Sequence, residues 1–184
     1  MKKLFLIAAV CQNGGIGIKG DLPWHLKAEL KYFSRMTKKV NDSAKRNAII
    51  MGRKTYFGVP EAKRPLPERL NIVLTRDPTA NVYPAGVMVC INMQEALDRL
   101  DQSPLVDEIE TIWIVGGNAV YKEAMESDRC HRLYITDVKA TFNCDAFFPE
   151  ITSDFKLVKN DADVPEEIQE ENGIQYQYKI YEKC

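Results

Sequence analysis

Residues 111–125 read TIWIVGGNAVYKEAM, and this stretch decides the fold class. The apolar run from Thr111 to Val115 is typical of a strand that is buried on both faces. After Gly116-Gly117, the residues from Asn118 to Met125 have helical spacing. A buried strand that leads straight into a helix indicates a parallel sheet covered by helices.

The same alternation extends from this unit in both directions along the chain. It predicts strands at residues 4–10, 48–51, 71–75 and 87–91, and helices at residues 26–40 and 93–100. After Cys130 the pattern changes, and residues 133–138, 155–158 and 174–181 are predicted strands, of which the last two fit an antiparallel pair at the sheet's edge. The acidic stretch from Asp161 to Asn172 is predicted to be a long solvated connection. We therefore expect one α/β domain over residues 1–184, with a mostly parallel central sheet, an antiparallel C-terminal edge strand and helices on both faces.

The composition is that of an ordinary globular domain. Hydrophobic residues make up 45% and charged residues 28% of the 184, which supplies a core and argues against disorder or a membrane span. The net charge of −1 does not indicate a nucleic-acid or membrane-surface protein. The five cysteines form no Cys-x-x-Cys pair and the two histidines lie far apart, so no metal site is expected. Reduced thiols of this kind are typical of a cytoplasmic protein.

The N-terminus resembles a short signal peptide, because Lys2-Lys3 precedes an apolar run at residues 4–10. The run is at the lower length limit, and Val10 is a poor residue before a lipoprotein-type cysteine. A buried first strand explains the same residues and is the interpretation that we favour. At the other end, the chain stops soon after the last predicted strand, so no second, fused catalytic domain is expected.

Residues 15–20, GIGIKG, match the dinucleotide-binding fingerprint G-x-G-x-x-G. The context differs, because that fingerprint opens a helix, whereas here Pro23 disfavours a helix at the preceding residue. We interpret this segment as a mobile glycine-rich loop that lies over a ligand.

Three strand ends carry residues suited to a phosphate. Gly116-Gly117 stands between a strand and a helix, where it is either a phosphate site or a tight turn without a ligand. Arg53-Lys54-Thr55 and Thr75-Arg76 follow two other strands, and such residues suit the 2′-phosphate of NADPH. Each of these cations could instead be a solvated surface charge, but they recur at equivalent positions. The carboxyl ends of parallel strands are where open α/β sheets bind ligands, which favours function.

Glu29 is the sharpest single signal in the sequence. On a helical wheel of residues 26–40 it falls inside an apolar stripe of Leu26, Leu30, Phe33, Met36 and Val40, whereas Lys38 falls on the solvated face. A carboxylate among apolar residues is costly unless it is paired. Glu29 therefore either forms a buried ion pair or serves a ligand.

Together these residues resemble the dihydrofolate reductases of the eukaryotic type, over residues 4–183. The motifs that carry the resemblance are Gly17 with GDLPW (20–24), IMGRKT (50–55), RPL (64–66), WIVGG (113–117), VYKEA (120–124), FFPEI (147–151) and YEK (181–183). The resemblance implies an NADPH-dependent enzyme that reduces 7,8-dihydrofolate to tetrahydrofolate, with hydride transfer to pteridine C6 and protonation at N5. It also implies antifolate inhibitors, a role in one-carbon metabolism, a cytoplasmic monomer, and no obligate membrane or nucleic-acid partner.

The resemblance also implies a role for particular residues. The catalytic residues would be Glu29, Trp24 and Leu22, with Glu29 holding the pteridine and promoting protonation at N5. The substrate site would comprise Ile7, Glu29, Leu30, Phe33, Val59, Arg69, Val115 and Thr136. In that site Arg69 would pair with the α-carboxylate of the glutamate tail, although its place at the start of a strand also fits a solvated charge. The cofactor site would comprise Ala9, Ile16, Gly17, Gly20, Asp21, Leu22, Arg53, Lys54, Thr55, Leu74, Thr75, Arg76, Gly116, Gly117, Asn118, Ala119, Val120 and Tyr121.

Four positions depart from the commoner vertebrate pattern, namely His25, Leu30, Tyr56 and Asn118. None of these changes touches the Glu29 carboxylate or the residues Lys54 and Arg76 that would clamp the 2′-phosphate of the cofactor. Two alternatives stay open. A relative that reduces a different pterin or a pyrimidine would lack the combination of Glu29 and Arg69, and a non-catalytic nucleotide-binding module would need no carboxylate on the apolar stripe.

Overall fold

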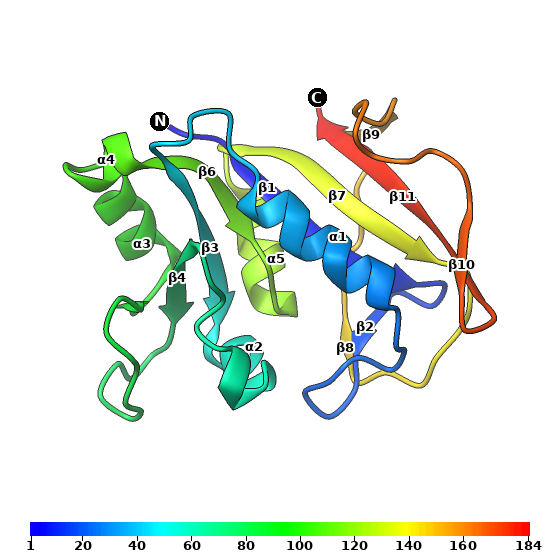
Figure 1. Ribbon diagram of the computed structural model, residues 1–184, viewed down its shortest axis with the longest axis horizontal. Coiled ribbons are helices and arrows are strands. Elements are labelled where there is room, and N and C mark those ends of the chain that lie inside the picture. Colours follow the sequence, from blue (N-terminus) through cyan, green and yellow to red (C-terminus); the bar gives the residue numbers. More distant parts are fainter.

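The computed structural model describes residues 1–184, which form one large mixed sheet and a small two-stranded one (Figure 1). The strands of the large sheet are β1 (Leu4–Cys11), β3 (Arg46–Gly52), β4 (Arg69–Leu74), β5 (Met88–Cys90), β6 (Ile109–Ile114), β7 (Cys130–Val138), β9 (Phe155–Val158), β10 (Gln169–Glu171) and β11 (Ile174–Lys183). Their order is β10-β11-β7-β1-β6-β3-β4-β5, and β9 also pairs with β11. The pairs from β7 to β5 are parallel, whereas β11 runs antiparallel to β7, β9 and β10. The predicted sheet is confirmed.

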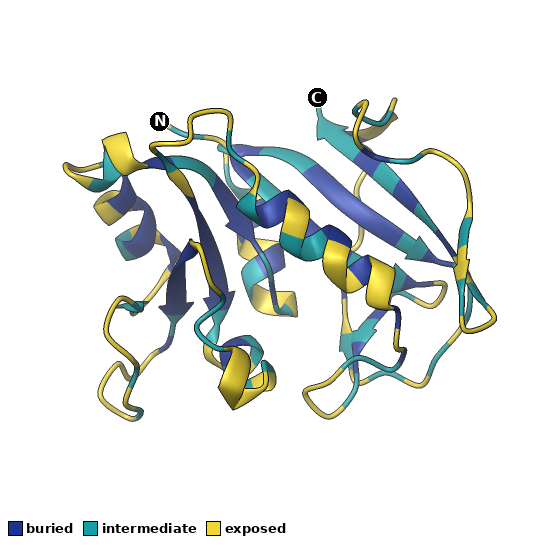
Figure 2. Cartoon of the chain, viewed as in Figure 1, coloured by how far each residue is buried: buried dark blue, intermediate teal, exposed yellow.

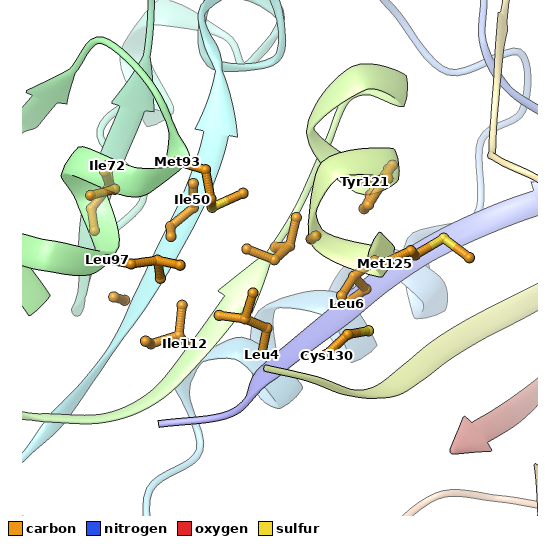
Figure 3. Packing of buried hydrophobic residues seen from close by; sticks show 14 of the residues in the cluster. Leu4, Leu6, Ile50, Ile72, Met93, Leu97, Ile112, Tyr121, Met125 and Cys130 are labelled. Carbon is orange, nitrogen blue, oxygen red and sulfur yellow. The ribbon is translucent and has the colours of Figure 1, made fainter. Parts of the chain in front are cut away.

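Helices cover both faces of this sheet. They are α1 (Lys27–Lys38), α2 (Arg53–Gly58), α3 (Met93–Leu100), α4 (Leu105–Glu108) and α5 (Asn118–Glu126). Tyr32 and Met36 of α1 pack on one face, in a cluster with Ile49 and Trp113 of the sheet. On the opposite face α3 and α5 lie over strand residues, and Figure 3 shows Met93, Leu97, Tyr121 and Met125 of these helices around Leu4, Leu6, Ile50, Ile72 and Ile112. No helix combines the length and the apolarity needed to cross a bilayer.

Burying both faces explains why the sequence of the central strands is so continuously apolar. Every residue from Ala48 to Ile50 of β3 is fully buried, and so are Ile112 and Ile114 of β6. In Figure 2 the central strands are mostly buried, and the exposed residues lie mainly on the outer faces of the helices and in the loops. The apolar run at the N-terminus is β1, which pairs with β7 from Leu4 to Cys11 and with β6 from Leu4 to Leu6, so the interpretation as a first strand is confirmed.

The prediction that the acidic stretch 161–172 is a long solvated connection is correct for most of its residues, which are exposed, but incomplete. It contains β10, and Val164 is buried. Asp161 accepts a hydrogen bond from Arg132 at 3.1 Å, and Asp163 from Lys39 at 2.6 Å. Because these carboxylates have basic partners on neighbouring elements, the stretch is fastened to the domain, although most of its residues stay exposed.

Short elements went unpredicted because they are too short to show a periodicity. These are α2, α4, a 3₁₀ turn at Glu61–Lys63, and the small sheet of β2 (Gly15–Gly17) and β8 (Ala146–Phe147). The pairing of β2 with β8 joins residues about 130 positions apart, which no local pattern can indicate. It fixes the first part of the glycine-rich segment as a strand, where we expected only loop.

The start of α1 is held by the β10–β11 end of the sheet. Leu26, at the cap position, offers no side-chain acceptor. Instead the Glu171 carboxylate of β10 accepts hydrogen bonds from the amides of Lys27 and Ala28, at 2.7 and 3.0 Å. A carboxylate at a helix N-terminus satisfies amides that have no partner within the helix and interacts favourably with the helix dipole. This contact positions the first turn of α1, which carries Glu29.

Candidate active site

A cleft of about 1380 Å³ opens between α1, α2, β1 and the turn from β6 to α5. It is lined by apolar side chains with a few polar ones, which is the usual character of a site for a small organic ligand. Its walls include Ile7 to Ala9 of β1, Phe33 of α1 and Val115 after β6. One end reaches Asn118, and the other reaches the segment from Pro65 to Arg69.

The glycine-rich segment forms part of this cleft. Ile16, Gly17, Gly20, Asp21 and Leu22 line it, and a backbone turn closes with hydrogen bonds between Ile18 and Asp21. A Cβ on Gly58, at the end of α2, would stand 2.8 Å from the Gly20 carbonyl oxygen. The segment thus meets α2 backbone to backbone, at a contact that only glycine leaves room for.

Glu29 projects from the first turn of α1 into the cleft and is only 6% exposed. Its Oε1 accepts a hydrogen bond of 2.9 Å from the Thr136 hydroxyl of β7. No ion pair in the structure involves it, so the alternative of a buried ion pair is wrong. Burial raises the pKa of Glu29 from 4.5 to about 7, and the Thr136 bond acts in the opposite direction. Such a carboxyl group can hold or release a proton near neutral pH.

Two further polar groups lie beside Glu29 at the inner end of the cleft. The Trp24 indole N–H is buried and donates to no protein acceptor. The Tyr121 hydroxyl of α5 donates to the Ile7 carbonyl at 2.7 Å, and burial raises the pKa of that phenol. Tyr121 therefore braces β1 against α5, in addition to lining the cleft.

Arg69, the first residue of β4, lies at the other end of the cleft and is 5% exposed. The alternative of a solvated strand-end charge is therefore wrong. Its Nε donates to the Pro67 carbonyl at 2.8 Å, and its Nη1 donates to the Thr37 hydroxyl at 3.0 Å. Burial lowers the pKa of Arg69. A guanidinium has five N–H donors, so this one is held in place by two of them and keeps three for a ligand.

The turn between β6 and α5 is shaped by Gly116, whose φ is +122°. A Cβ there would make only ordinary contacts, at 3.4 Å from the Tyr121 ring and 3.5 Å from Thr55 Oγ1, so glycine serves the backbone conformation at this position. The peptide between Gly116 and Gly117 is cis. The first amides of α5 follow directly, and Gly116, Gly117 and Asn118 all line the cleft.

The basic residues predicted at two strand ends lie side by side. Gly52 of β3 pairs with Leu74 of β4, so Arg53-Lys54 and Thr75-Arg76 leave the sheet together. Arg53, Lys54 and Arg76 are exposed, and none of the three forms an ion pair. Their recurrence at equivalent strand ends thus produces a cluster of unpaired cations beside α2.

Most of the residues named from the sequence line this one cleft. They are Ile7, Ala9, Ile16, Gly17, Gly20, Asp21, Leu22, Trp24, Glu29, Leu30, Phe33, Lys54, Thr55, Val59, Arg69, Val115, Gly116, Gly117, Asn118 and Tyr121. The others, which do not line it, are Arg53, Leu74, Thr75, Arg76, Ala119, Val120 and Thr136. Of these, Thr136 touches Glu29, and the rest lie at the strand and helix ends described above.

The predicted apolar stripe of α1 needs correction. The buried residues of this helix are Glu29, Tyr32, Met36 and Thr37, whereas Leu30 is 52% exposed and lines the cleft. The stripe divides because one side of α1 packs on the sheet and the other faces the cleft. Lys38, expected on the solvated face, is half-buried and also lines the cleft.

Sequence reasoning missed several residues of the cleft wall. The missed residues are Ala8, His25, Ser34, Lys38, Met51, Gly58, Pro60, Ala62, Lys63, Pro65, Leu66, Pro67, Asp145 and Ala146. Asp145 and Ala146 arrive there through the pairing of β8 with β2, for which the sequence has no signal. Pro65 lies within a motif that was noticed and His25 directly follows one, so their place beside the cleft could have been inferred.

Comparisons with known proteins agree with this architecture. A family model described as dihydrofolate reductase matches residues 3–183. The dihydrofolate reductase of Aedes albopictus is 80% identical over 183 residues, covering 100% of this chain and 98% of that protein. The enzyme of Drosophila melanogaster is 57% identical, covering 100% and 99%. The structure of Schistosoma mansoni dihydrofolate reductase superposes with a TM-score of 0.88 at 31% identity, covering 100% of this chain and 99% of that one.

The fold and the cleft thus define an α/β oxidoreductase that takes a nicotinamide cofactor and a small organic substrate. More particularly, the chain belongs to the dihydrofolate reductase family, as the full-length family match and the 80% identity show. The reaction of the family is the reduction of dihydrofolate to tetrahydrofolate. The insect and vertebrate relatives confirm the resemblance to the eukaryotic type.

Proposed function

We propose that this enzyme reduces 7,8-dihydrofolate at pteridine C6, with protonation at N5, and that Glu29 is the residue on which the reaction depends. The observation that carries the proposal is a buried carboxyl group in a ligand-sized cleft, with Thr136 as its only hydrogen-bond partner in the chain. A pKa of about 7 lets Glu29 be anionic or neutral at physiological pH. The anion can accept hydrogen bonds from the 2-amino group and N3 of a pteridine, which are adjacent donors.

Thr136 and Trp24 assist Glu29 in the proposed reaction. The Thr136 hydroxyl donates its hydrogen bond to Oε1 of Glu29. This bond orients the plane of the carboxyl group and leaves Oε2 for the ligand. The Trp24 N–H, which has no protein acceptor, positions a water that carries a proton toward N5. Leu22 and Phe33 exclude other water from the reacting carbons, which strengthens electrostatic interactions there. The carbonyls of Ile7 and Val115 face the pteridine ring.

The other end of the cleft suits the substrate's tail. Leu30, Phe33 and Val59 line the path between Glu29 and Arg69 and form an apolar channel for the benzoyl ring. Arg69 is held rigidly by Pro67 and Thr37, so its remaining donors are oriented in advance. A planar guanidinium forms two parallel hydrogen bonds with a carboxylate, which matches the α-carboxylate of the glutamate tail. Antifolates that carry such a carboxylate would use the same residue.

The cofactor that these residues fit is NADPH, and it supplies the hydride when it is bound. The unpaired cations Arg53, Lys54 and Arg76 suit the 2′-phosphate, together with the hydroxyls of Thr55 and Thr75. The Gly116-Gly117 turn and the first amides of α5, from Asn118 to Val120, suit the pyrophosphate. Ala9, Ile16, Gly17, Gly20, Asp21, Leu22 and Tyr121 would flank the nicotinamide, and Leu74 the adenosine. The glycines at these positions let the backbone approach a ligand closely.

We further propose that residues 1–184 act as one catalytic domain, as a cytoplasmic monomer that supplies tetrahydrofolate for one-carbon metabolism. Five cysteines without a disulfide are typical of a reducing compartment and support the location. The apparent mass in a sedimentation experiment tests the oligomeric state.

The direct test of this function is a spectrophotometric assay. Purified protein mixed with NADPH and 7,8-dihydrofolate should consume NADPH in a one-to-one ratio with tetrahydrofolate formed. NADH at the same concentration should support a much lower kcat/KM. Oxidation of NADPH by another pterin but not by dihydrofolate would overturn the substrate assignment, and equal kcat/KM values for the two cofactors would overturn the cofactor assignment.

A further inference from the structure

Two of the five cysteines lie together at the edge of the cleft, and no step of the reaction uses them. Cys11 is the last residue of β1 and is buried, whereas Cys144 lies in the segment before β8 and is partly exposed. A Cβ on Gly15 would stand 2.2 Å from the Cys144 sulfur and 3.1 Å from the Cys11 sulfur. Burial and, after it, the neighbouring Cys11 thiol raise the pKa of Cys144. Glycine at position 15 thus leaves the space in which the two thiols meet.

The two segments that carry these thiols are already fastened to each other. The Gln12 amide donates to the Ala140 carbonyl at 3.0 Å, and the Phe148 amide donates to the Gly14 carbonyl at 2.9 Å. The Cys11 thiol donates to Asn13 Oδ1 at 2.7 Å. Asn13 in turn donates to the carbonyl of Phe142, two residues before Cys144, at 2.9 Å. Oxidation would remove the Cys11 S–H and with it the bond to Asn13, whereas the two backbone bonds and the Asn13–Phe142 bond involve no sulfur and would still hold the segments together.

We propose that Cys11 and Cys144 are a modification site, at which a small-molecule disulfide converts the two thiols into an intramolecular disulfide. The Cys144 thiolate attacks one sulfur of the small disulfide and displaces one thiol. The Cys11 thiolate then attacks the Cys144 sulfur and displaces the second thiol. The protein loses two hydrogens and two electrons, and the small disulfide is reduced to two thiols, so the exchange is reversible. Cys144 reacts first because Cys11 is buried.

The crosslink would tie the end of β1 to the segment that leads into β8. Gly17 accepts a hydrogen bond at its carbonyl from the Asp145 amide, at 3.0 Å, and both residues line the cleft. Opening of the β2–β8 pair separates these segments, and a covalent bond at Cys11–Cys144 opposes that separation. The oxidised protein should therefore protect the backbone amides of β2 and β8 more strongly from hydrogen exchange. This inference does not depend on the proposed reaction, because it is tested by hydrogen exchange and by counting free thiols, and neither measurement reports enzyme activity.

The test uses the full chain with Cys184→Ser, which removes the exposed thiol at the C-terminus. Burial and the neighbouring Cys11 thiol raise the pKa of Cys144, so exchange is slow and the sample is brought to equilibrium in buffers of rising oxidised-to-reduced glutathione ratio. We expect the number of titratable thiols to fall by two in one step. Mass spectrometry of an unreduced digest should identify a peptide pair joined at Cys11 and Cys144 and lighter by two hydrogens.

Matched variants identify the pair. Adding Cys144→Ser or Cys11→Ser should abolish the loss of two thiols, whereas Cys130→Ser, a buried thiol on β7, should leave it intact. A stable glutathione adduct on Cys144 without the crosslink would overturn the proposal. So would a crosslink to another cysteine, or two thiols that stay reduced at the most oxidising ratio. Unchanged exchange at β2 and β8 in the crosslinked protein would overturn the inferred tether.

Discussion

Charged residues behave differently at the antiparallel end of the sheet and in the cleft. At the antiparallel end Arg132 donates to Glu182 at 2.8 Å and to Asp161 at 3.1 Å, and all three side chains are partly exposed. In the cleft Glu29 and Arg69 are more deeply buried, and neither forms an ion pair. Partly exposed ion pairs lose little hydration free energy on folding and add little to the stability of the fold. A buried charge without a paired countercharge lowers that stability. The cleft thus retains a cost in stability that a ligand can offset.

The two cleft charges also differ from each other. Burial lowers the pKa of Arg69, but a guanidinium starts so high that it stays charged. Burial raises the pKa of Glu29 to about 7, within the range where small changes switch its state. One end of the cleft is therefore a fixed cation and the other is a proton switch. This is the division of labour expected if one end binds a carboxylate and the other assists a protonation.

The largest effect is expected from Glu29→Gln. The carboxamide keeps the shape but can neither become an anion nor transfer a proton, so kcat near neutral pH should fall by about 10²–10⁴-fold. Steady-state kinetics with dihydrofolate measure this loss. Glu182→Gln, a carboxylate of the paired region, is the matched control and should leave turnover unchanged. Near-normal turnover of Glu29→Gln would remove Glu29 from the mechanism.

Removal of the fixed cation should chiefly affect binding. Arg69→Leu keeps much of the packing but deletes every donor, so dihydrofolate should bind more weakly by about 2–4 kcal/mol. A pteridine without a glutamate tail has no carboxylate to lose, and its Kd should hardly change. Arg69→Lys retains the charge without the planar pair of donors and should restore only part of the affinity. Equal weakening of both ligands would mean that Arg69 holds the shape of the pocket.

The cost of burying Glu29 should appear as a pH dependence of stability. The pKa of Glu29 is about 7 in the folded protein, against 4.5 as an ordinary carboxyl group. The folded state therefore binds more protons between these values, and its free energy of unfolding falls as pH rises from about 4.5 to 7. The loss amounts to about 3 kcal/mol above pH 7.

Urea unfolding of the wild type and Glu29→Gln at several pH values isolates this contribution. The wild type should lose stability relative to the variant as pH rises through that window. Glu182→Gln should give the opposite trend, because pairing with Arg132 lowers the pKa of Glu182, and its stabilisation is lost as pH falls. If the difference in free energy of unfolding between the wild type and Glu29→Gln is the same at every pH, the pKa of Glu29 is not raised in the folded protein.

The smallest of these effects concerns Arg76, an unpaired cation that does not line the cleft. Arg76→Ala removes a charge-assisted contact of about 1.5–3 kcal/mol to the 2′-phosphate. The affinity for NADPH should fall by about 10–150-fold, whereas that for NADH should hardly move. Lys156→Ala, an exposed cation on β9, is the control and should change neither. Equal losses of affinity for both cofactors would assign Arg76 a structural role.

The sequence predicts the parallel sheet well because burial on both faces leaves a local signature. Residues 48–51 are apolar without alternation, and they lie at the centre of β3. Glu29 could be found for the same reason, since a charge interrupts an apolar helical stripe. The strand β10 could not be predicted, because its place depends on pairing with β11 and on Glu171 capping α1.

The partners of the two cleft charges are also hidden from the sequence. Thr136 meets Glu29 only because β7 lies beside β1, and no pattern around Thr136 distinguishes it from any other strand threonine. The burial of Arg69 depends on Thr37, 32 positions away on α1. Contacts between distant segments decide these environments, and local periodicity does not encode them. Resemblance to a family supplied the assignments that the residues alone did not.

The protonation of Glu29 decides whether the cleft holds a proton switch, and an NMR titration of the ¹³Cδ resonances of the glutamates measures it. One resonance should titrate with a midpoint near pH 7, as burial of Glu29 requires, and it should be missing in Glu29→Gln. The resonance of Glu182 should titrate below the ordinary value, because Arg132 lowers its pKa. If every glutamate titrates with a midpoint near or below 4.5, the cleft holds an ordinary carboxylate and the proposed proton switch does not exist.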